Sequence, residues 1–185
     1  MSAKVVLASS SPRRREILAE MGIDFEVCPT DADESSVGVS SPKRLVKALS
    51  ALKAYPAVNA HPDAVVIGAD TIVVSGGKIY GKPLTEENAV KMIRQLNGRW
   101  HIVYTGVTVA KGQRRTTFVV KSKVKFKSLT DEQIIEYVRA FKPLDKAGAY
   151  GIQDEEIVEK YKGSYSNIVG LPKEKLAKTL ARYGV

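Results

Sequence analysis

Several features are scarce in this chain of 185 residues, and each absence removes a class of protein. A single cysteine, Cys28, excludes an intramolecular disulfide and fits a reducing compartment. No apolar run approaches the ~20 residues that a membrane helix needs, and the apolar stretch at the N-terminus is too short for a signal peptide. The sequence therefore predicts a cytoplasmic protein without a membrane partner.

Three common catalytic motifs are also missing. There is no G-x-x-x-x-G-K-S/T stretch, which excludes a P-loop enzyme, and no G-x-G-x-x-G to support a Rossmann dinucleotide site. The two histidines, His61 and His101, are too few and too far apart for a zinc motif. Cys28 has no histidine-based support as a nucleophile. Any chemistry must therefore use other groups.

Positive charge is abundant. The chain has 29 Lys and Arg against 20 Asp and Glu, a formal net charge of +9. This balance suits an anionic partner without naming it, because nucleic acid, nucleotides and acidic surfaces all qualify. A composition of 44% hydrophobic and 26% charged residues is that of a globular protein. The length predicts one domain over residues 1–185, with room for two lobes around a cleft.

Short apolar runs alternate with amphipathic segments along the chain. Helices are expected over residues 12–21, 41–55, 85–97, 130–141 and 173–183, and strands over residues 4–9, 25–28, 64–74, 78–80, 101–110 and 116–127. The second helix is expected to end before Pro56 and to bury Leu45, Ala48, Leu49 and Leu52. Hairpins mixed with helices predict an α/β fold with a mixed sheet flanked by helices.

The stretch "SSSPRRREIL" places three arginines in the first turn of a helix, where the helix dipole disfavours cations. Ser11 and Pro12 are typical of a helix start. Free backbone N–H groups, the hydroxyls of Ser9 and Ser11, and the guanidinium groups of Arg13 and Arg14 together predict a phosphate site. Arg15 fits a solvated surface position.

Asp70 lies inside the apolar strand "VVIGADTIVV". A carboxylate there is costly unless it is paired or binds a metal. A strand-end aspartate that caps a turn is the alternative, and the apolar residues on both sides favour a pocket role. Accepting a proton from water or lowering the pKa of bound water are the tasks that suit it.

Other charged groups leave two interpretations open. The acidic loop of Asp31, Asp33 and Glu34 is as consistent with solvated acids as with ligands of a hard divalent metal. Lys53 and Lys82 fit either exposed amines with buried stems or point charges that neutralise a triphosphate. The lysines that alternate over residues 121–127 fit a solvated strand face better than a nucleic-acid surface.

With these residues assembled, the sequence resembles the Maf family, once described as septum formation proteins. The resemblance spans nearly the whole chain and rests on "LASSSPRRREIL", "LKA", "IGADTIV", "GKPLT", "VYTGV", "LDKAGAYGIQ" and "GSYSNIVGLP". It implies a fold like that of inosine triphosphate pyrophosphatases, with a central cleft, and an acid-anhydride hydrolase. Such enzymes cleave a nucleoside triphosphate to the monophosphate and pyrophosphate with Mg²⁺ or Mn²⁺. A homodimer is also implied.

The resemblance also assigns roles to residues. It implies that Asp70 is the general base. Glu34 matches another position of the pocket, and a carboxylate from Glu34 or Asp70 is expected to hold the metal. Arg13, Thr71 and Gln153 match the positions that mark the branch acting on dTTP and UTP, as opposed to the 7-methyl-GTP branch. Lys53 and Lys82 match further pocket positions. Standard and modified pyrimidine nucleotides both remain open as substrates, and so does a role in restraining cell division.

One segment departs from the family. Members usually have a glycine-containing stretch after GIQ, whereas this chain reads "GIQDEEIVEKYKGSY", which is shorter and more acidic. The rival hypothesis from another class is a basic protein that binds nucleic acid or regulates division without catalysis. It rests on the net charge and the lysine face, and it needs neither Asp70 nor a metal.

Overall fold

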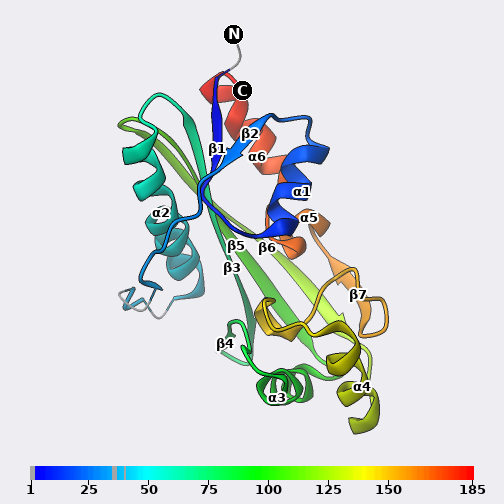
Figure 1. Ribbon diagram of the computed structural model, residues 1–185. Helices are drawn as coiled ribbons and strands as arrows, with labels where there is room; N and C mark the ends of the chain where they lie inside the picture. The colour runs from blue at the N-terminus through cyan, green and yellow to red at the C-terminus, as the bar shows by residue number, and fades with distance from the viewer. Residues whose placement is uncertain (1–2, 35–36, 40) are drawn as a thin grey trace.

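The computed structural model describes residues 3–34, 37–39 and 41–185, and its centre is one seven-stranded sheet (Figure 1). The strand order is β2-β1-β3-β5-β6-β7, and β4 pairs with β3 outside this path. The strands are β1 (Val5–Leu7), β2 (Phe25–Val27), β3 (Val65–Ser75), β4 (Lys78–Tyr80), β5 (Trp100–Lys111), β6 (Arg114–Phe126) and β7 (Val158–Lys162). β1 runs parallel to β2 and β3, and the remaining pairs are antiparallel. The mixed sheet is therefore confirmed.

Helices lie on both faces and at one end of this sheet. In Figure 1, α2 packs on one face of the upper half, α1, α5 and α6 lie on the other side, and α3 and α4 lie at the lower end. The helices are α1 (Pro12–Glu20), α2 (Pro42–Ala60), α3 (Glu86–Leu96), α4 (Asp131–Phe141), α5 (Tyr165–Val169) and α6 (Lys173–Leu180), with short 3₁₀ turns at Ala147–Ala149 and Ala181–Tyr183. The predicted α/β class with flanking helices is confirmed.

Helix ends mostly follow the local signals in the sequence. Ser11 is the N-cap of α1 with Pro12 in the first turn, although the Ser11 side chain makes no capping hydrogen bond. Thr85 caps α3, and Thr130 and Gln133 form the predicted capping box of α4. The last predicted helix divides into α6 and a 3₁₀ turn.

The predicted end of α2 is wrong, because the helix continues through Pro56 to Ala60. Proline removes one backbone hydrogen bond inside a helix. The next turn compensates by burying Ala57 and Val58 in an apolar cluster with Val6 and Ala8 of the first strand and its loop.

The predicted buried face of α2 is also wrong in part. Leu49 is buried as expected, but Leu45, Ala48 and Leu52 are only partly buried. The buried positions lie on a rotated stripe and include Val46, Leu49, Ser50, Ala54, Ala57 and Val58. This stripe faces β3 and β5, which the periodicity of α2 alone could not reveal.

Part of one edge of β3 lies open. β1 pairs with residues 65–67 of β3, and β4 pairs with residues 73–75. Between them, none of the described strands pairs with residues 68–72 on this edge, while β5 covers the opposite edge. Val65 donates its N–H to Lys4 and Ile67 accepts from Ala8, so strand alternation directs the backbone groups of residues 69 and 71 into the opening. We call this opening the β3 window.

Side-chain exposure on β6 agrees with one prediction. Lys121 and Lys123 of β6 are exposed while Ser122, Val124 and Phe126 are buried, which confirms the alternation. No helix in the described part of the chain is long and apolar enough to cross a membrane.

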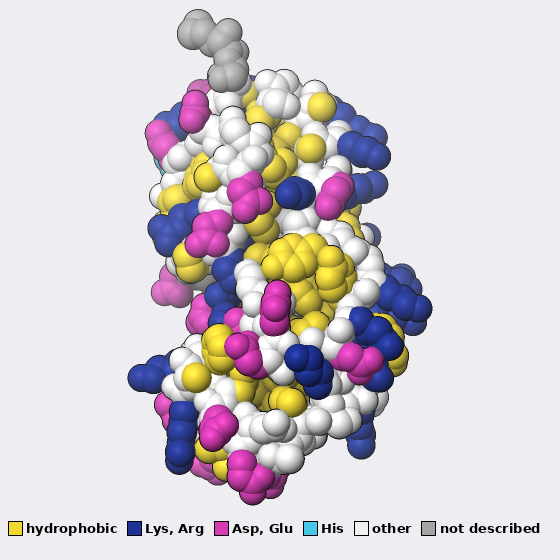
Figure 2. All heavy atoms as spheres, turned by 90° about the vertical axis from the view of Figure 1, so that its right-hand side faces the viewer, with side chains coloured by type: hydrophobic (Ala, Val, Ile, Leu, Met, Phe, Trp, Pro, Cys, Tyr) yellow, Lys and Arg dark blue, Asp and Glu magenta, His cyan; other side chains and the backbone are white. Residues whose placement is uncertain are grey.

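Figure 2, which faces the right-hand side of Figure 1, shows an apolar patch ringed by charges of both signs. The homodimer stays a prediction.

Candidate active site

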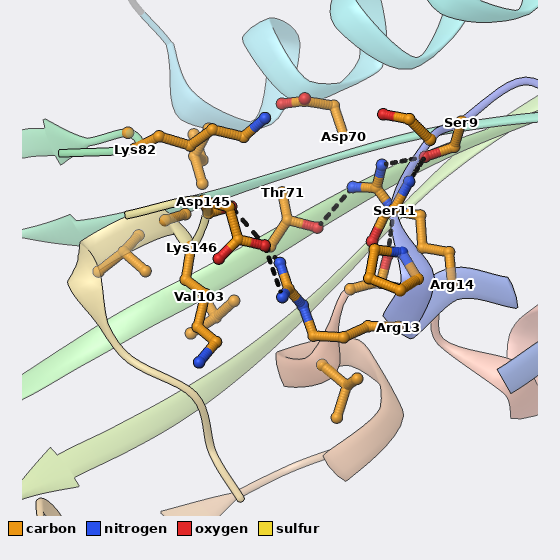
Figure 3. Close-up of a pocket in the computed structure, with 18 of the residues that line it drawn as sticks. Ser9, Ser11, Arg13, Arg14, Asp70, Thr71, Lys82, Val103, Asp145 and Lys146 are labelled. Atoms are coloured by element: carbon orange, nitrogen blue, oxygen red, sulfur yellow. Dashed lines mark hydrogen bonds and ion pairs between the residues drawn. The ribbon is translucent and has the colours of Figure 1, made fainter. Parts of the chain in front are cut away.

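A cavity of about 550 Å³ opens beside the β3 window (Figure 3). Its lining comes from the start of α1, from α2, β3, the loop after β4, the loop over residues 145–153 and the end of α5. These segments are distant in sequence and surround the middle of β3. The predicted central cleft is therefore present.

Arg14 makes the most contacts in the wall of the cavity. Its Nε donates to the Gly170 carbonyl at 3.0 Å, Nη1 donates to Ser9 Oγ at 3.1 Å, and Nη2 donates to Thr71 Oγ1 at 3.3 Å. Burial lowers the pKa of the Arg14 guanidinium, and the charge of Asp70 opposes this shift. All three partners are neutral oxygens, so the guanidinium keeps its capacity to attract an anion.

A chain of hydroxyl groups fixes Thr71 behind Arg14. Thr71 Oγ1 lies 3.0 Å from Thr105 Oγ1, and the Thr105 hydroxyl donates to the Asn167 carbonyl at 2.9 Å. Gly170 adopts a φ of +127°, which a residue with a side chain rarely adopts. No local pattern pointed to Thr105 or Asn167, although both lie in the quoted family motifs.

Asp70 projects from the opposite face of β3 and meets Lys53 of α2. Asp70 is 7% exposed, and Lys53 Nζ lies 2.5 Å from its Oδ1. The same amine lies 2.8 Å from Glu34 Oε1. The two carboxylates expected to hold a metal therefore meet at one amine.

Two glycines set the distance between α2 and the sheet. A Cβ on Gly68 of β3 would lie 2.5 Å from the Ser50 carbonyl oxygen, and a Cβ on Gly106 of β5 would clash with the carbonyl of Val46. Without these side chains, the α2 backbone packs directly on the strands. Because Lys53 lies one turn after Ser50 and Asp70 two residues after Gly68, this close packing places Lys53 against Asp70.

Arg13 reaches across the cavity to the opposite wall. Its Nη1 lies 2.9 Å from Asp145 Oδ2, and Nη2 contacts the Asp145 carbonyl at 3.4 Å. Burial opposes ionisation of Asp145, but the hydrogen bond and charge of Arg13 outweigh it and lower the pKa of the carboxyl group. Arg15 is exposed, as predicted. Sequence reasoning did not identify Asp145.

The remaining predicted residues lie around the mouth of the cavity. Lys82 follows β4, is exposed, and points its amine toward Asp70 (Figure 3). Ser11 is partly buried and donates its N–H to Ser9 Oγ at 3.3 Å. Gln153 is exposed on the loop after Tyr150 and also lines the cavity.

The acidic loop is only partly in the site. Glu34 lines the cavity, whereas Asp31 and Asp33 are not among its lining residues. Within the described residues, no group of three or more His, Cys, Asp or Glu side chains could hold a metal. Mg²⁺ commonly uses one or two carboxylates together with substrate phosphates. Glu34 and Asp70, which already meet at a cation, fit that smaller donor set.

The fold and cavity define an α/β protein whose cleft combines cations for a polyanion with a buried carboxylate. Residues 4–183 match the family described as Maf-like protein. The chain belongs to the Maf family, as the resemblance predicted.

Curated relatives and one solved structure were also found. The chain is 43% identical over 189 residues to the dTTP/UTP pyrophosphatase of Syntrophus aciditrophicus (strain SB), covering 100% of this chain and 92% of that protein. It is 46% identical to the dTTP/UTP pyrophosphatase of Thermosipho africanus (strain TCF52B), covering 94% and 90%. The Staphylococcus aureus Ham1 protein shares 18% identity with a TM-score of 0.46, covering 69% of this chain and 72% of that one.

Proposed function

We propose that this protein is a nucleoside triphosphate pyrophosphatase that converts dTTP and UTP to the monophosphate and pyrophosphate. The observation that carries the proposal is the pairing of Arg14 and Asp70 on opposite faces of β3 at one opening. One group attracts phosphate and the other accepts a proton. The names of the relatives supply the substrates.

The triphosphate would lie along the β3 window. Arg14 already holds Ser9 and Thr71 in place and can turn its charge toward a phosphate oxygen. Lys82 at the mouth and Arg13, once released from Asp145, add positive charge. Ser11 at the start of α1 adds a hydroxyl beside free backbone N–H groups.

Glu34 and Asp70 are the residues that would hold Mg²⁺ or Mn²⁺. Their meeting point is occupied by the Lys53 amine, which would have to move aside or share the carboxylates. A bound divalent metal would supply charge neutralisation for the phosphates. The metal and its identity belong to this proposal.

The chemical step requires a base beside the α-phosphate. Asp70 accepts a proton from water while the water oxygen forms a bond to the α-phosphorus. The bond from that phosphorus to the bridging oxygen breaks, and pyrophosphate leaves with the bonding electrons. Arg14, Lys53 and Lys82 stabilise the negative charge that moves onto pyrophosphate.

Base choice is assigned to Gln153, which lines the cavity on the loop after Tyr150. Gln153 presents an amide, which can both donate and accept hydrogen bonds and so can read the edge of a base. A site built on such bonds rejects a base that leaves them unpaired. Arg13 and Thr71, the other markers of the dTTP and UTP branch, lie close to Arg14 and favour that branch.

The test is to incubate the protein with dTTP, UTP, CTP, dATP, GTP and 7-methyl-GTP, with and without Mg²⁺, and to identify the products. We expect monophosphate and pyrophosphate from dTTP and UTP only when the metal is present. Release of orthophosphate would contradict the proposed bond cleavage. A preference for 7-methyl-GTP would contradict the assigned branch.

The same preparation tests the rival hypothesis. Exposed lysines on β6 motivate a nucleic-acid-binding protein, whose affinity for duplex DNA would fall steeply with salt. Such binding without any nucleotide hydrolysis would favour the rival. A role in restraining cell division stays a prediction.

A further inference from the structure

A second buried aspartate lies beside the cavity, and the proposed reaction does not use it. Asp154 is 9% exposed. Its Oδ2 accepts a hydrogen bond from the Tyr137 hydroxyl at 2.6 Å and from the Gly151 N–H at 2.9 Å, and Lys146 Nζ lies 3.6 Å away. Asp154 also occupies the segment where the sequence departs from the Maf family. We call these four residues the Asp154 clamp.

The clamp joins a loop to a helix. Asp154 donates its own N–H to the Gly151 carbonyl at 3.1 Å, which closes a turn over residues 151–154. Tyr137 belongs to α4, so its hydrogen bond ties this turn to the helix. A Cβ on Gly151 would lie 2.9 Å from Asp154 Oδ2, so the carboxylate fits under the turn because residue 151 is glycine.

The turn controls where Gln153 points. Ile152 and Asp154 on either side of Gln153 are buried, whereas Gln153 is exposed and lines the cavity. With both neighbours fixed in the interior, Gln153 is left at the surface of the turn. Its Oε1 would lie 3.1 Å from a Cβ on Gly151, so the amide lies over the clamped turn.

The Tyr137 hydroxyl acts as a hydrogen-bond donor in the clamp. Burial, reinforced by the Asp154 carboxylate, raises the pKa of Tyr137 above its ordinary value. The phenol therefore keeps its proton and remains a donor. A buried carboxylate is tolerated when it is hydrogen-bonded and paired, and Tyr137, Gly151 and Lys146 meet both conditions.

We propose that Asp154 is a positioning residue for base selection, which holds the Gln153 amide at the angle that reads the pyrimidine. This inference rests on the proposed function, because it takes Gln153 as the group that contacts the base. Loss of the clamp releases the turn and weakens discrimination between bases. The phosphate end of the cavity, at Arg14 and Asp70, has no contact with the clamp among the hydrogen bonds and ion pairs described above.

The test compares kcat and KM for dTTP, UTP and CTP in Asp154→Ala, Asp154→Asn and Tyr137→Phe. The matched control is Tyr183→Phe, which also removes a buried hydroxyl; Tyr183 donates to the Val109 carbonyl at 3.0 Å and does not line the cavity. We expect the ratio of kcat/KM for dTTP over CTP to fall at least ~10-fold in Asp154→Ala, mainly through KM for dTTP. The ratio stays at the wild-type value in Tyr183→Phe.

The conservative variants separate positioning from general destabilisation. Asp154→Asn keeps an acceptor for the Gly151 N–H and should recover most of the selectivity. Tyr137→Phe keeps the ring packed, and its ratio of kcat/KM for dTTP over CTP should fall roughly threefold. This variant tests the inference if Asp154→Ala does not fold. Unchanged selectivity in a folded Asp154→Ala, or in Tyr137→Phe if Asp154→Ala does not fold, would overturn the inference.

A second measurement separates this inference from the proposed function. If the wild-type protein cleaves none of the nucleotides, the proposed function fails. Amide hydrogen exchange without nucleotide still tests the clamp. We expect exchange at residues 151–153 to be at least ~10-fold faster in Tyr137→Phe than in Tyr183→Phe. Equal exchange rates at residues 151–153 in the two variants would overturn the inference that the clamp holds this turn.

Discussion

Asp70 and Asp154 are both buried aspartates beside one cavity, but their partners differ. Asp70 contacts Lys53, a flexible amine that also contacts Glu34. Asp154 is held by a phenol, a backbone N–H and a more distant lysine. The Asp70 carboxylate therefore has a partner that can leave, whereas the contacts of Asp154 are fixed by the fold.

This difference teaches that burial alone does not mark a reactive group. A carboxylate that must accept a proton needs access to substrate and a partner that can exchange. A carboxylate that sets the shape of a loop needs donors that do not move. The four predictions below test this distinction, from the largest expected effect to the smallest.

The largest effect is expected from Asp70→Asn. An amide cannot accept a proton from water, so kcat should fall by about 10²–10⁴-fold. Pyrophosphate release from dTTP measures the change. Asp131→Asn, which removes one exposed partner of Arg94, serves as a control and should keep the wild-type rate. A folded Asp70→Asn with full activity would rule out the assigned base and remove the distinction between the two aspartates.

Arg14→Lys tests the proposed phosphate-binding end of the cavity. Lysine keeps the charge but cannot contact Gly170, Ser9 and Thr71 together, so kcat/KM for dTTP should fall about 10- to 100-fold. Arg15→Lys is the matched control, because Arg15 is exposed on the same helix. An equal fall in kcat/KM in Arg14→Lys and Arg15→Lys would contradict the assignment of Arg14 to the site and of Arg15 to the solvated surface.

His101 extends the comparison to a buried group without an opposite charge. It lies between Phe126 and Tyr150, with Nε2 2.8 Å from the Tyr150 hydroxyl, and burial lowers its pKa to about 4. The unfolded chain takes up this proton near the ordinary value of about 6.5, so acid favours unfolding. Between pH 7.5 and pH 5 this residue alone should reduce the free energy of unfolding by about 2 kcal/mol.

Denaturant unfolding at both pH values measures that loss. In His101→Gln, which cannot titrate, the difference between pH 7.5 and pH 5 should shrink by about the same 2 kcal/mol. The free energy of unfolding of this variant at pH 7.5, compared with that of the wild type, gives the stability lost through altered packing. An unchanged pH dependence would show that His101 does not titrate as its burial predicts.

The smallest effect is expected from Asp145→Asn. The ion pair between Arg13 and Asp145 is largely exposed at the carboxylate, 59%, so it contributes little to stability. Its removal frees Arg13 for substrate, and KM for dTTP should fall about two- to threefold. Asp131→Asn again serves as the control. A rise in KM would instead assign Asp145 to the substrate-binding side.

The parts of the site that the sequence reveals are those that break local rules. Arg13 and Arg14 lie at a helix start that disfavours cations, and Asp70 interrupts an apolar strand. These conflicts can be recognised within a few neighbouring residues, because the residue type there disagrees with what the helix start or the apolar strand favours. The mixed sheet was also predictable, since hairpins and helices alternate along the chain.

The parts that the sequence did not reveal depend on contacts between distant segments. Asp145 pairs with Arg13 from 132 residues away, and the hydroxyl of Thr105 contacts the Asn167 carbonyl from 62 residues away. Nothing near Asp145 in the chain identifies its partner. The passage of α2 through Pro56 has the same origin, because the burial of Ala57 and Val58 outweighs the local signal.

The β3 window has a consequence for how the protein avoids self-association. An open strand edge normally offers a template on which another chain can pair. Residues 68–72 span roughly 17 Å at the rise of an extended strand, and residues 70–72 of this stretch line the cavity. Arg13, Lys82 and Lys146 line the same cavity, so an incoming strand would meet several positive charges. The cations that we propose attract a small polyanion would also disfavour pairing of another strand at this edge.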